Sequence, residues 1–159
     1  LLISVTSSGQ ITPVRPPPYF ILIERALRDE GTSYHYLPPA RYSAASELLV
    51  DKLDGAFDDL AEPVLRGATW TTDAPFRETA QAIEAMRAEG LLAVEMEAAA
   101  LFAFAQARGK AVICFAHVTN QMGQIEGDFE KGAENGTADA LAVVVRAARR
   151  LWPGAVIAR

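Results

Sequence analysis

Apolar and polar positions follow two different periods along this chain, one typical of strands and the other typical of helices. Four runs rich in β-branched and apolar residues predict strands at Leu1–Thr6, Val64–Thr72, Leu91–Val94 and Lys110–Thr119. The last run is apolar almost throughout. We therefore expect it to form a central strand that is buried on both faces of the sheet.

Four other segments carry apolar residues at spacings of three and four, which is the pattern of an amphipathic helix. These segments are Ser43–Leu60, Arg77–Glu89, Glu97–Arg108 and Asn135–Trp152. Ser43 is the expected N-cap of the first helix, because its hydroxyl can accept a bond from a free backbone N–H. Gly109 is the expected left-handed residue that ends the third helix.

Residues Tyr19–Glu30 fit both patterns. The spacing of Phe20, Ile23 and Leu27 suits one face of a helix, whereas the unbroken run Phe20–Ile23 would equally form a buried strand. Periodicity does not separate the two in so short a run. The four prolines just before it predict an extended loop, because proline disrupts both helices and strand pairing.

The alternation of strands and helices predicts a single α/β domain with a mixed, largely parallel sheet flanked by helices, and 159 residues suit one domain. Ligands of such sheets bind beyond the carboxyl ends of the strands. Candidate site residues therefore follow the predicted strands, at Ser7-Ser8-Gly9, Thr71-Thr72-Asp73, Glu95-Met96-Glu97 and Thr119-Asn120.

Composition narrows the possible partners. With 20 acidic and 15 basic residues the net charge is −5, which argues against nucleic acid as a partner. No apolar run approaches the roughly 20 residues that cross a bilayer, so no membrane partner is expected. The single cysteine, Cys114, allows no disulfide within the chain and fits a cytoplasmic location. Two isolated histidines predict no metal site.

The junction Glu95-Met96-Glu97 carries the most chemical information. Its carboxylates precede a predicted helix that begins with three alanines. On one interpretation the acidic residues only stabilise the helix N-terminus, where backbone N–H groups lack partners. On the other, one carboxylate faces a ligand and accepts hydrogen bonds from a sugar diol, with Met96 against the sugar ring.

Several motifs resemble the nucleoside phosphorylase superfamily, which includes uridine and purine nucleoside phosphorylases and related nucleosidases. They occur in the family's order and span nearly the whole chain, at Arg28–Ser33, Thr72–Phe76, Ala93–Leu101 and His117–Asn120. The resemblance implies a strand within Tyr19–Ala26. His117 stands inside the apolar run Val112–Val118, which favours a place in the core or at a subunit interface over a metal site.

The resemblance also implies roles for individual residues. Ribose would be bound by Glu95, Met96 and Glu97, the base by Phe76, Arg77 and Asn120, and phosphate by a turn at Ser7, Ser8 and Gly9. Glu97 and Asn120 would be the catalytic residues. The implied reaction is cleavage of a ribonucleoside at its N-glycosidic bond, with inorganic phosphate as co-substrate and no other cofactor.

Departures from the family pattern leave alternatives open. Asn120 stands where purine-specific members carry Asp, which favours uridine or a similar nucleoside. Ser4 stands where phosphorolytic members carry Arg, and Thr6 where they carry Gly. The alternatives to phosphorolysis are a phosphate-independent nucleosidase and a catalytically silent nucleoside-binding or structural subunit.

The run Leu1–Val5 has the pattern of a buried strand that begins within a fold. We therefore expect residues 1–159 to be the carboxy-terminal two-thirds of a phosphorylase-like domain, truncated at the amino terminus and weakly active or inactive alone. The full-length protein is expected to form a dimer-based homo-oligomer, such as a hexamer.

Overall fold

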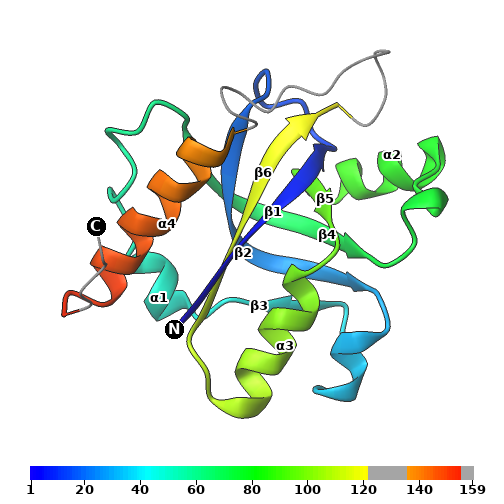
Figure 1. Cartoon of the computed structure of the whole chain (residues 1–159). Helices are drawn as coiled ribbons and strands as arrows, with labels where there is room; N and C mark the ends of the chain where they lie inside the picture. Colours follow the sequence, from blue (N-terminus) through cyan, green and yellow to red (C-terminus); the bar gives the residue numbers. More distant parts are fainter. Residues whose placement is uncertain (122–135, 155–159) are drawn as a thin grey trace.

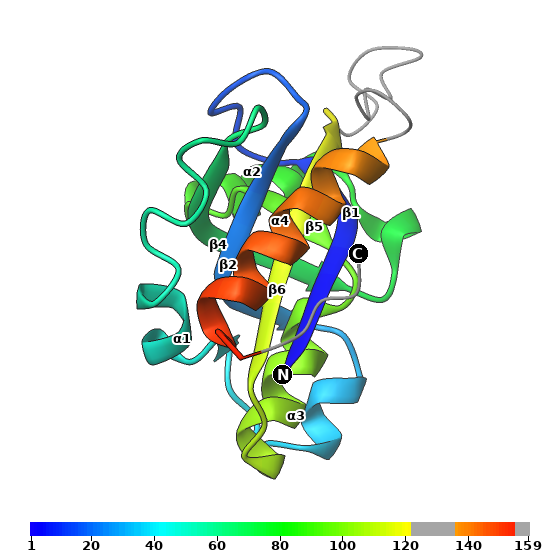
Figure 2. The same cartoon turned by 60° about the vertical axis from the view of Figure 1, so that its left-hand side comes forward.

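A six-stranded sheet that curls into a ring forms the centre of the molecule. The computed structural model describes residues 1–121 and 136–154. The strand order is β3-β2-β4-β5-β1-β6, and β2 also pairs with β6. Figures 1 and 2 show how this extra pairing brings β6 alongside β2, with the helices on the outside.

The strands are β1 (Leu2–Gln10), β2 (Tyr19–Asp29), β3 (Tyr42–Ala44), β4 (Val64–Thr72), β5 (Ala93–Glu95) and β6 (Val112–Asn120). The helices are α1 (Glu47–Asp51), α2 (Ala80–Ala88), α3 (Ala98–Arg108) and α4 (Thr137–Leu151). Two short 3₁₀ helices, η1 (Thr32–His35) and η2 (Pro75–Arg77), follow β2 and β4.

The sheet is mixed, and the prediction of a mixed α/β fold is confirmed. Its closure into a ring, with three parallel and three antiparallel pairings among the described strands, departs from the predicted largely parallel sheet flanked by helices. Strand β1 is parallel to β6, and β4 is parallel to both β2 and β5. The pairs β1–β5, β2–β3 and β2–β6 are antiparallel. The connection from β1 to β2 contains no helix, and β2 returns in the opposite direction to pair antiparallel with β6, which is parallel to β1.

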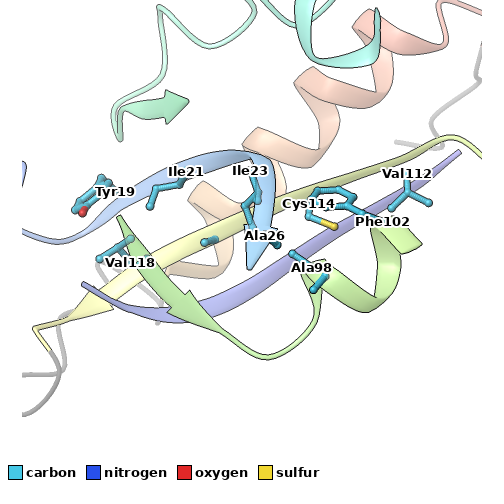
Figure 3. Packing of buried hydrophobic residues seen from close by; sticks show 12 residues of the cluster. Tyr19, Ile21, Ile23, Ala26, Ala98, Phe102, Val112, Cys114 and Val118 are labelled. Atoms are coloured by element: carbon cyan, nitrogen blue, oxygen red, sulfur yellow. The ribbon is translucent and has the colours of Figure 1, made fainter. Parts of the chain in front are cut away.

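Strand β2 resolves the ambiguity of residues 19–30 in favour of a strand, as the resemblance implied. Tyr19 and Ile21 face a cluster that includes Phe102 of α3, whereas Phe20 and Leu22 face the cluster under α1 and α4. Figure 3 shows the first of these clusters. Strand β6 is likewise buried on both faces along nearly its whole length, as predicted.

The predicted helix Ser43–Leu60 is largely wrong. Ser43, the expected N-cap, lies in β3, and α1 covers only five residues before a series of turns. Gly55 within those turns has a φ of 70°, a left-handed conformation that does not continue a right-handed helix. Leu53 and Phe57 still reach the core, so the apolar spacing reflects burial without a continuous helix.

The remaining helices lie close to their predicted positions. Helix α3 ends at Gly109, which has a φ of 59° and is the predicted left-handed cap. Helix α2 begins at Ala80 instead of Arg77, because Arg77 belongs to η2. The predicted start of the last helix, Asn135, lies outside the described residues. In the segments that the structure describes, no helix is both long and apolar enough to span a bilayer.

Candidate functional site

The junction between β5 and α3 carries three of the predicted site residues. Ala98 and Ala99 at the start of α3 are buried against the sheet, and their small side chains allow the helix N-terminus to approach the strands closely. The carboxylates of Glu95 and Glu97 therefore lie at the end of the helix where backbone N–H groups lack partners within the helix.

Glu95 is enclosed, with only 2% of its surface exposed. Its Oε1 accepts hydrogen bonds from the hydroxyls of Thr69 and Thr71, and its Oε2 accepts from the backbone N–H groups of Glu97 at 2.8 Å and Ala98 at 2.7 Å. A carboxylate has about four acceptor positions. All are filled from within the fold, so the geometry leaves Glu95 no capacity to accept a sugar hydroxyl.

Glu97, in contrast, is exposed. Its Oε2 accepts hydrogen bonds from Thr6 Oγ1 at 2.6 Å and from the backbone N–H of Met96 at 3.1 Å. Among the described residues no hydrogen bond reaches Oε1 of Glu97, which can accept from a ligand. Met96 beside it is 47% exposed, so an acceptor and an apolar surface lie next to each other.

Ser7, Ser8 and Gly9 do not form the predicted turn, because β1 continues through them to Gln10. Pairing with β6 along this stretch and with β5 from Gly9 onward holds the segment extended, with an irregularity between Ser8 and Gly9. Successive N–H groups of an extended strand do not converge on one point as they do in an anion-binding turn. Ser8 is buried, and its hydroxyl has no partner among the described residues.

The carboxyl end of β6 meets β1 through hydroxyl groups. Ser7 Oγ lies 3.1 Å from Thr119 Oγ1, and Asn120 Nδ2 donates to the same Thr119 oxygen at 3.4 Å. His117 lies two residues before Thr119 in β6. It is buried, and its ring stacks on that of Phe20 with the centroids 4.3 Å apart. The prediction that His117 lies in the core is therefore confirmed.

A hollow of about 400 Å³ opens beside these residues, between β1, β6 and α4. Thr6, Ser7 and Thr119 line it, and its volume falls within the usual range of ligand sites. Thr6 and Ser7 are consecutive residues of a strand, whose side chains leave on opposite faces. Thr6 thus meets Glu97 on one side of β1 while Ser7 meets Thr119 on the other.

Two of the residues predicted to bind the base, Phe76 and Arg77, follow one another in η2, whereas the third, Asn120, ends β6. Phe76 is 85% exposed, and Arg77 lines a different hollow of about 760 Å³ together with Trp70 and Tyr34. Neither residue lines the hollow beside Ser7. Within the described residues the structure thus groups Glu97 and Met96 near β1, and Asn120 near Ser7, but does not bring Arg77 to them.

Four threonines take part in the site. Sequence analysis named Thr71 and Thr119 only as candidates at strand ends, and it gave Thr6 and Thr69 no role there. Thr6 holds Glu97, Thr119 joins Ser7 to Asn120, and Thr69 and Thr71 hold Glu95. One signal was present: Thr69 and Thr71 stand two apart in a buried strand and so share a face, where two polar side chains require a polar partner. Over the same described segments, no group of three potential metal ligands comes together.

The buried carboxyl group gives a testable pH dependence. Burial raises the pKa of Glu95 above its ordinary value, and the hydrogen bonds that it accepts oppose this rise. A carboxyl group with a raised pKa binds its proton more tightly in the folded state, so the free energy of unfolding falls as pH rises from about 4 towards the folded-state pKa. Glu95→Gln cannot titrate and should lack this fall.

Urea unfolding of both proteins at intervals between about pH 4 and pH 8 measures the difference. Burial also raises the pKa of Glu78, which contributes equally to both curves and cancels when they are subtracted. If the unfolding free energies of the wild-type protein and of Glu95→Gln change in parallel across this pH range, the raised pKa does not belong to Glu95.

The chain thus combines a mixed sheet closed on itself with an exposed carboxylate, Glu97, at a strand-to-helix junction. The chain belongs to the phosphorylase superfamily, whose family model matches residues 1–151. It is also similar in fold to a solved structure described as a P knowlesi homolog of P falciparum PNP, with a TM-score of 0.75 and 18% sequence identity. That match covers 92% of this chain and 60% of the other. The comparison with curated proteins gave no match.

Proposed function

We propose that this protein cleaves the N-glycosidic bond of a ribonucleoside, by phosphorolysis of uridine or a similar nucleoside to the free base and ribose 1-phosphate. The observation that supports this most is the exposed carboxylate of Glu97, which has Oε1 available beside the exposed side chain of Met96. Membership of the phosphorylase superfamily and the fold shared with a protein described as a PNP homolog support the same reaction class.

In this proposal the chemistry follows from charge. Breaking the bond develops positive charge on the sugar and negative charge on the base, so the site needs an acceptor for the sugar hydroxyls and donors near the base. Glu97 accepts from the diol and Met96 covers the sugar ring. Asn120 donates its amide N–H to the base, and Phe76 and Arg77 are the other proposed base-binding residues.

Phosphate is the nucleophile in the proposal, bound near Ser7, Ser8 and Gly9 as co-substrate. Two observations favour a phosphate-independent nucleosidase as the second candidate. The segment is an extended strand without a converging set of N–H groups, and Ser4 lies at the position where the resemblance calls for Arg. A homo-oligomer remains a prediction of the resemblance, and a cytoplasmic location remains a prediction from the single cysteine. A catalytically silent nucleoside-binding or structural subunit remains the alternative that the departures from the family pattern leave open.

The test measures free base by absorbance after incubation of the protein with uridine, inosine or methylthioadenosine, with and without inorganic phosphate. Phosphorolysis predicts release of base only when phosphate is present. Release without phosphate would replace phosphorolysis by hydrolysis. Nucleoside binding by calorimetry without any release would assign a silent binding subunit, and absence of both binding and release would contradict the proposal.

A further inference from the structure

A polar cluster buried between β4 and the first turn of α3 ends at the proposed sugar-binding residue. Thr69 and Thr71 are fully buried and lie on the same face of β4. Strands β4 and β5 are parallel, with Thr71 opposite Glu95 in the register. Both hydroxyls therefore reach Oε1 of Glu95 directly. We call Thr69, Thr71 and Glu95 the buried clamp.

Thr71 makes a second contact that ties the clamp to the helix. Its Oγ1 accepts a hydrogen bond from the backbone N–H of Ala99 at 3.0 Å. A hydroxyl group has one proton to donate and lone pairs that accept. The Thr71 hydroxyl therefore donates to Glu95 and accepts from the N–H of Ala99. The orientation of the helix N-terminus is thus fixed relative to β4 by one side chain.

The clamp holds Glu97 in a backbone conformation that the helix itself would not give it. Glu97 has φ −128° and ψ −40°, whereas helical residues have φ near −63°. Its N–H donates to Oε2 of Glu95 at 2.8 Å, and this bond fixes the peptide plane from which its side chain extends towards Thr6. Without it, Glu97 could adopt helical angles and turn its carboxylate away from Thr6.

We propose that Glu95 is a positioning residue, which acts together with Thr69 and Thr71 to fix the carboxylate of Glu97 for the sugar diol; this rests on the proposed function. Glu95 itself does not touch the sugar, because its acceptor positions are filled by four donors of the fold. A helix cap alone would affect the stability of α3. The clamp in addition determines how well the protein distinguishes a ribonucleoside from a nucleoside that lacks the diol.

The test measures the dissociation constants of uridine and 2′,3′-dideoxyuridine. The constant for dideoxyuridine divided by the constant for uridine measures recognition of the diol. Thr71→Val removes the hydroxyl with little change in shape, and Glu95→Asp keeps the charge but shortens the reach by one methylene. We expect either change to reduce the ratio about tenfold, which corresponds to the loss of one hydrogen bond to a charged group. Thr71→Ser keeps the hydroxyl and should restore the ratio. Thr69→Val removes a single donor and provides the milder variant if Thr71→Val does not fold.

Thr79→Val is the matched control, because Thr79 caps α2 through its hydroxyl and lies outside the clamp. It should lower stability and leave the ratio unchanged. If the clamp variants weaken both nucleosides equally, Glu95 has only a structural role and the proposal is overturned.

A second readout needs no nucleoside and separates this proposal from the proposed function. Side-chain couplings measured by NMR in the unliganded protein should report a single χ1 rotamer for Glu97, and an average over rotamers in Thr71→Val and Glu95→Asp. A single Glu97 rotamer in both variants would overturn the clamp even if uridine binds. Failure of the wild-type protein to bind any nucleoside would overturn the proposed function, and the couplings would still decide the role of Glu95.

Discussion

Glu97→Gln is expected to weaken the binding of a ribonucleoside by tenfold to about a hundredfold, as measured by calorimetry with uridine. The amide that replaces the carboxylate is neutral and has one oxygen instead of two. A hydrogen bond to a charged group is worth about 1.5–3 kcal/mol, which corresponds to this range. The hydroxyl of Thr6 would also lose its charged acceptor, so the side chain would be held less firmly.

Glu84→Gln is the matched control for this prediction. Glu84 is an exposed carboxylate on α2 that pairs with Arg87, and it lies outside the proposed site. Its replacement should leave the affinity for uridine within error of the wild-type value. Equal affinities of the Glu97→Gln variant and the wild-type protein would remove Glu97 from the sugar site.

Phe102→Ala is expected to lower the free energy of unfolding by about 3–5 kcal/mol, measured by urea or thermal unfolding. Phe102 is fully buried where α3 packs on the sheet, as Figure 3 shows. Truncation removes apolar contacts and leaves a cavity that the surrounding strands fill only in part. Because α3 carries the carboxylates at its N-terminus, nucleoside affinity should fall as well.

Leu48→Ala provides the comparison, because Leu48 is an apolar residue of α1 that is mostly exposed. Its replacement should change stability by no more than about 0.5 kcal/mol. A loss of less than about 1 kcal/mol for Phe102→Ala would show that α3 does not depend on this contact.

The elements that sequence alone predicts well are those whose burial follows a local pattern. Strand β6 is apolar at almost every position and is buried on both faces, and α3 ends at a glycine that adopts the required left-handed conformation. The helix expected from Ser43 to Leu60 was wrong for a related reason. Spacing reports which residues are buried, and the turns around Gly55 bury Leu53 and Phe57 without a helix.

Closure of the sheet was not predictable in this way, because it depends on contacts between residues far apart in the chain. Phe20 pairs with His117 and Leu2 with Val112, and nothing in either segment alone specifies an antiparallel or a parallel partner. The same pairing explains the error at Ser7, Ser8 and Gly9. These residues have the composition of a turn, but β6 pairs with all three and β5 also pairs with Gly9, which holds them in β1.

The candidate site shows the same division. Sequence placed Glu95 and Glu97 together at the start of a helix, and the structure confirms this position. Which of the two is enclosed depends on Thr69 and Thr71, which lie 26 and 24 residues before Glu95. The first interpretation of the acidic pair applies to Glu95, which accepts hydrogen bonds from N–H groups at the helix N-terminus. Glu97 is exposed, and the second interpretation stays a prediction for it.

Ring closure also affects how the protein avoids joining other chains. An exposed strand edge offers unpaired backbone groups on which a second polypeptide can add a strand, and this is a common start of aggregation. Here β6 occupies the edge of β2 at its first residues and β3 occupies the same edge further along. The edge that β3 leaves outward is only three residues long, so this side of β2 offers little template for intermolecular strand addition.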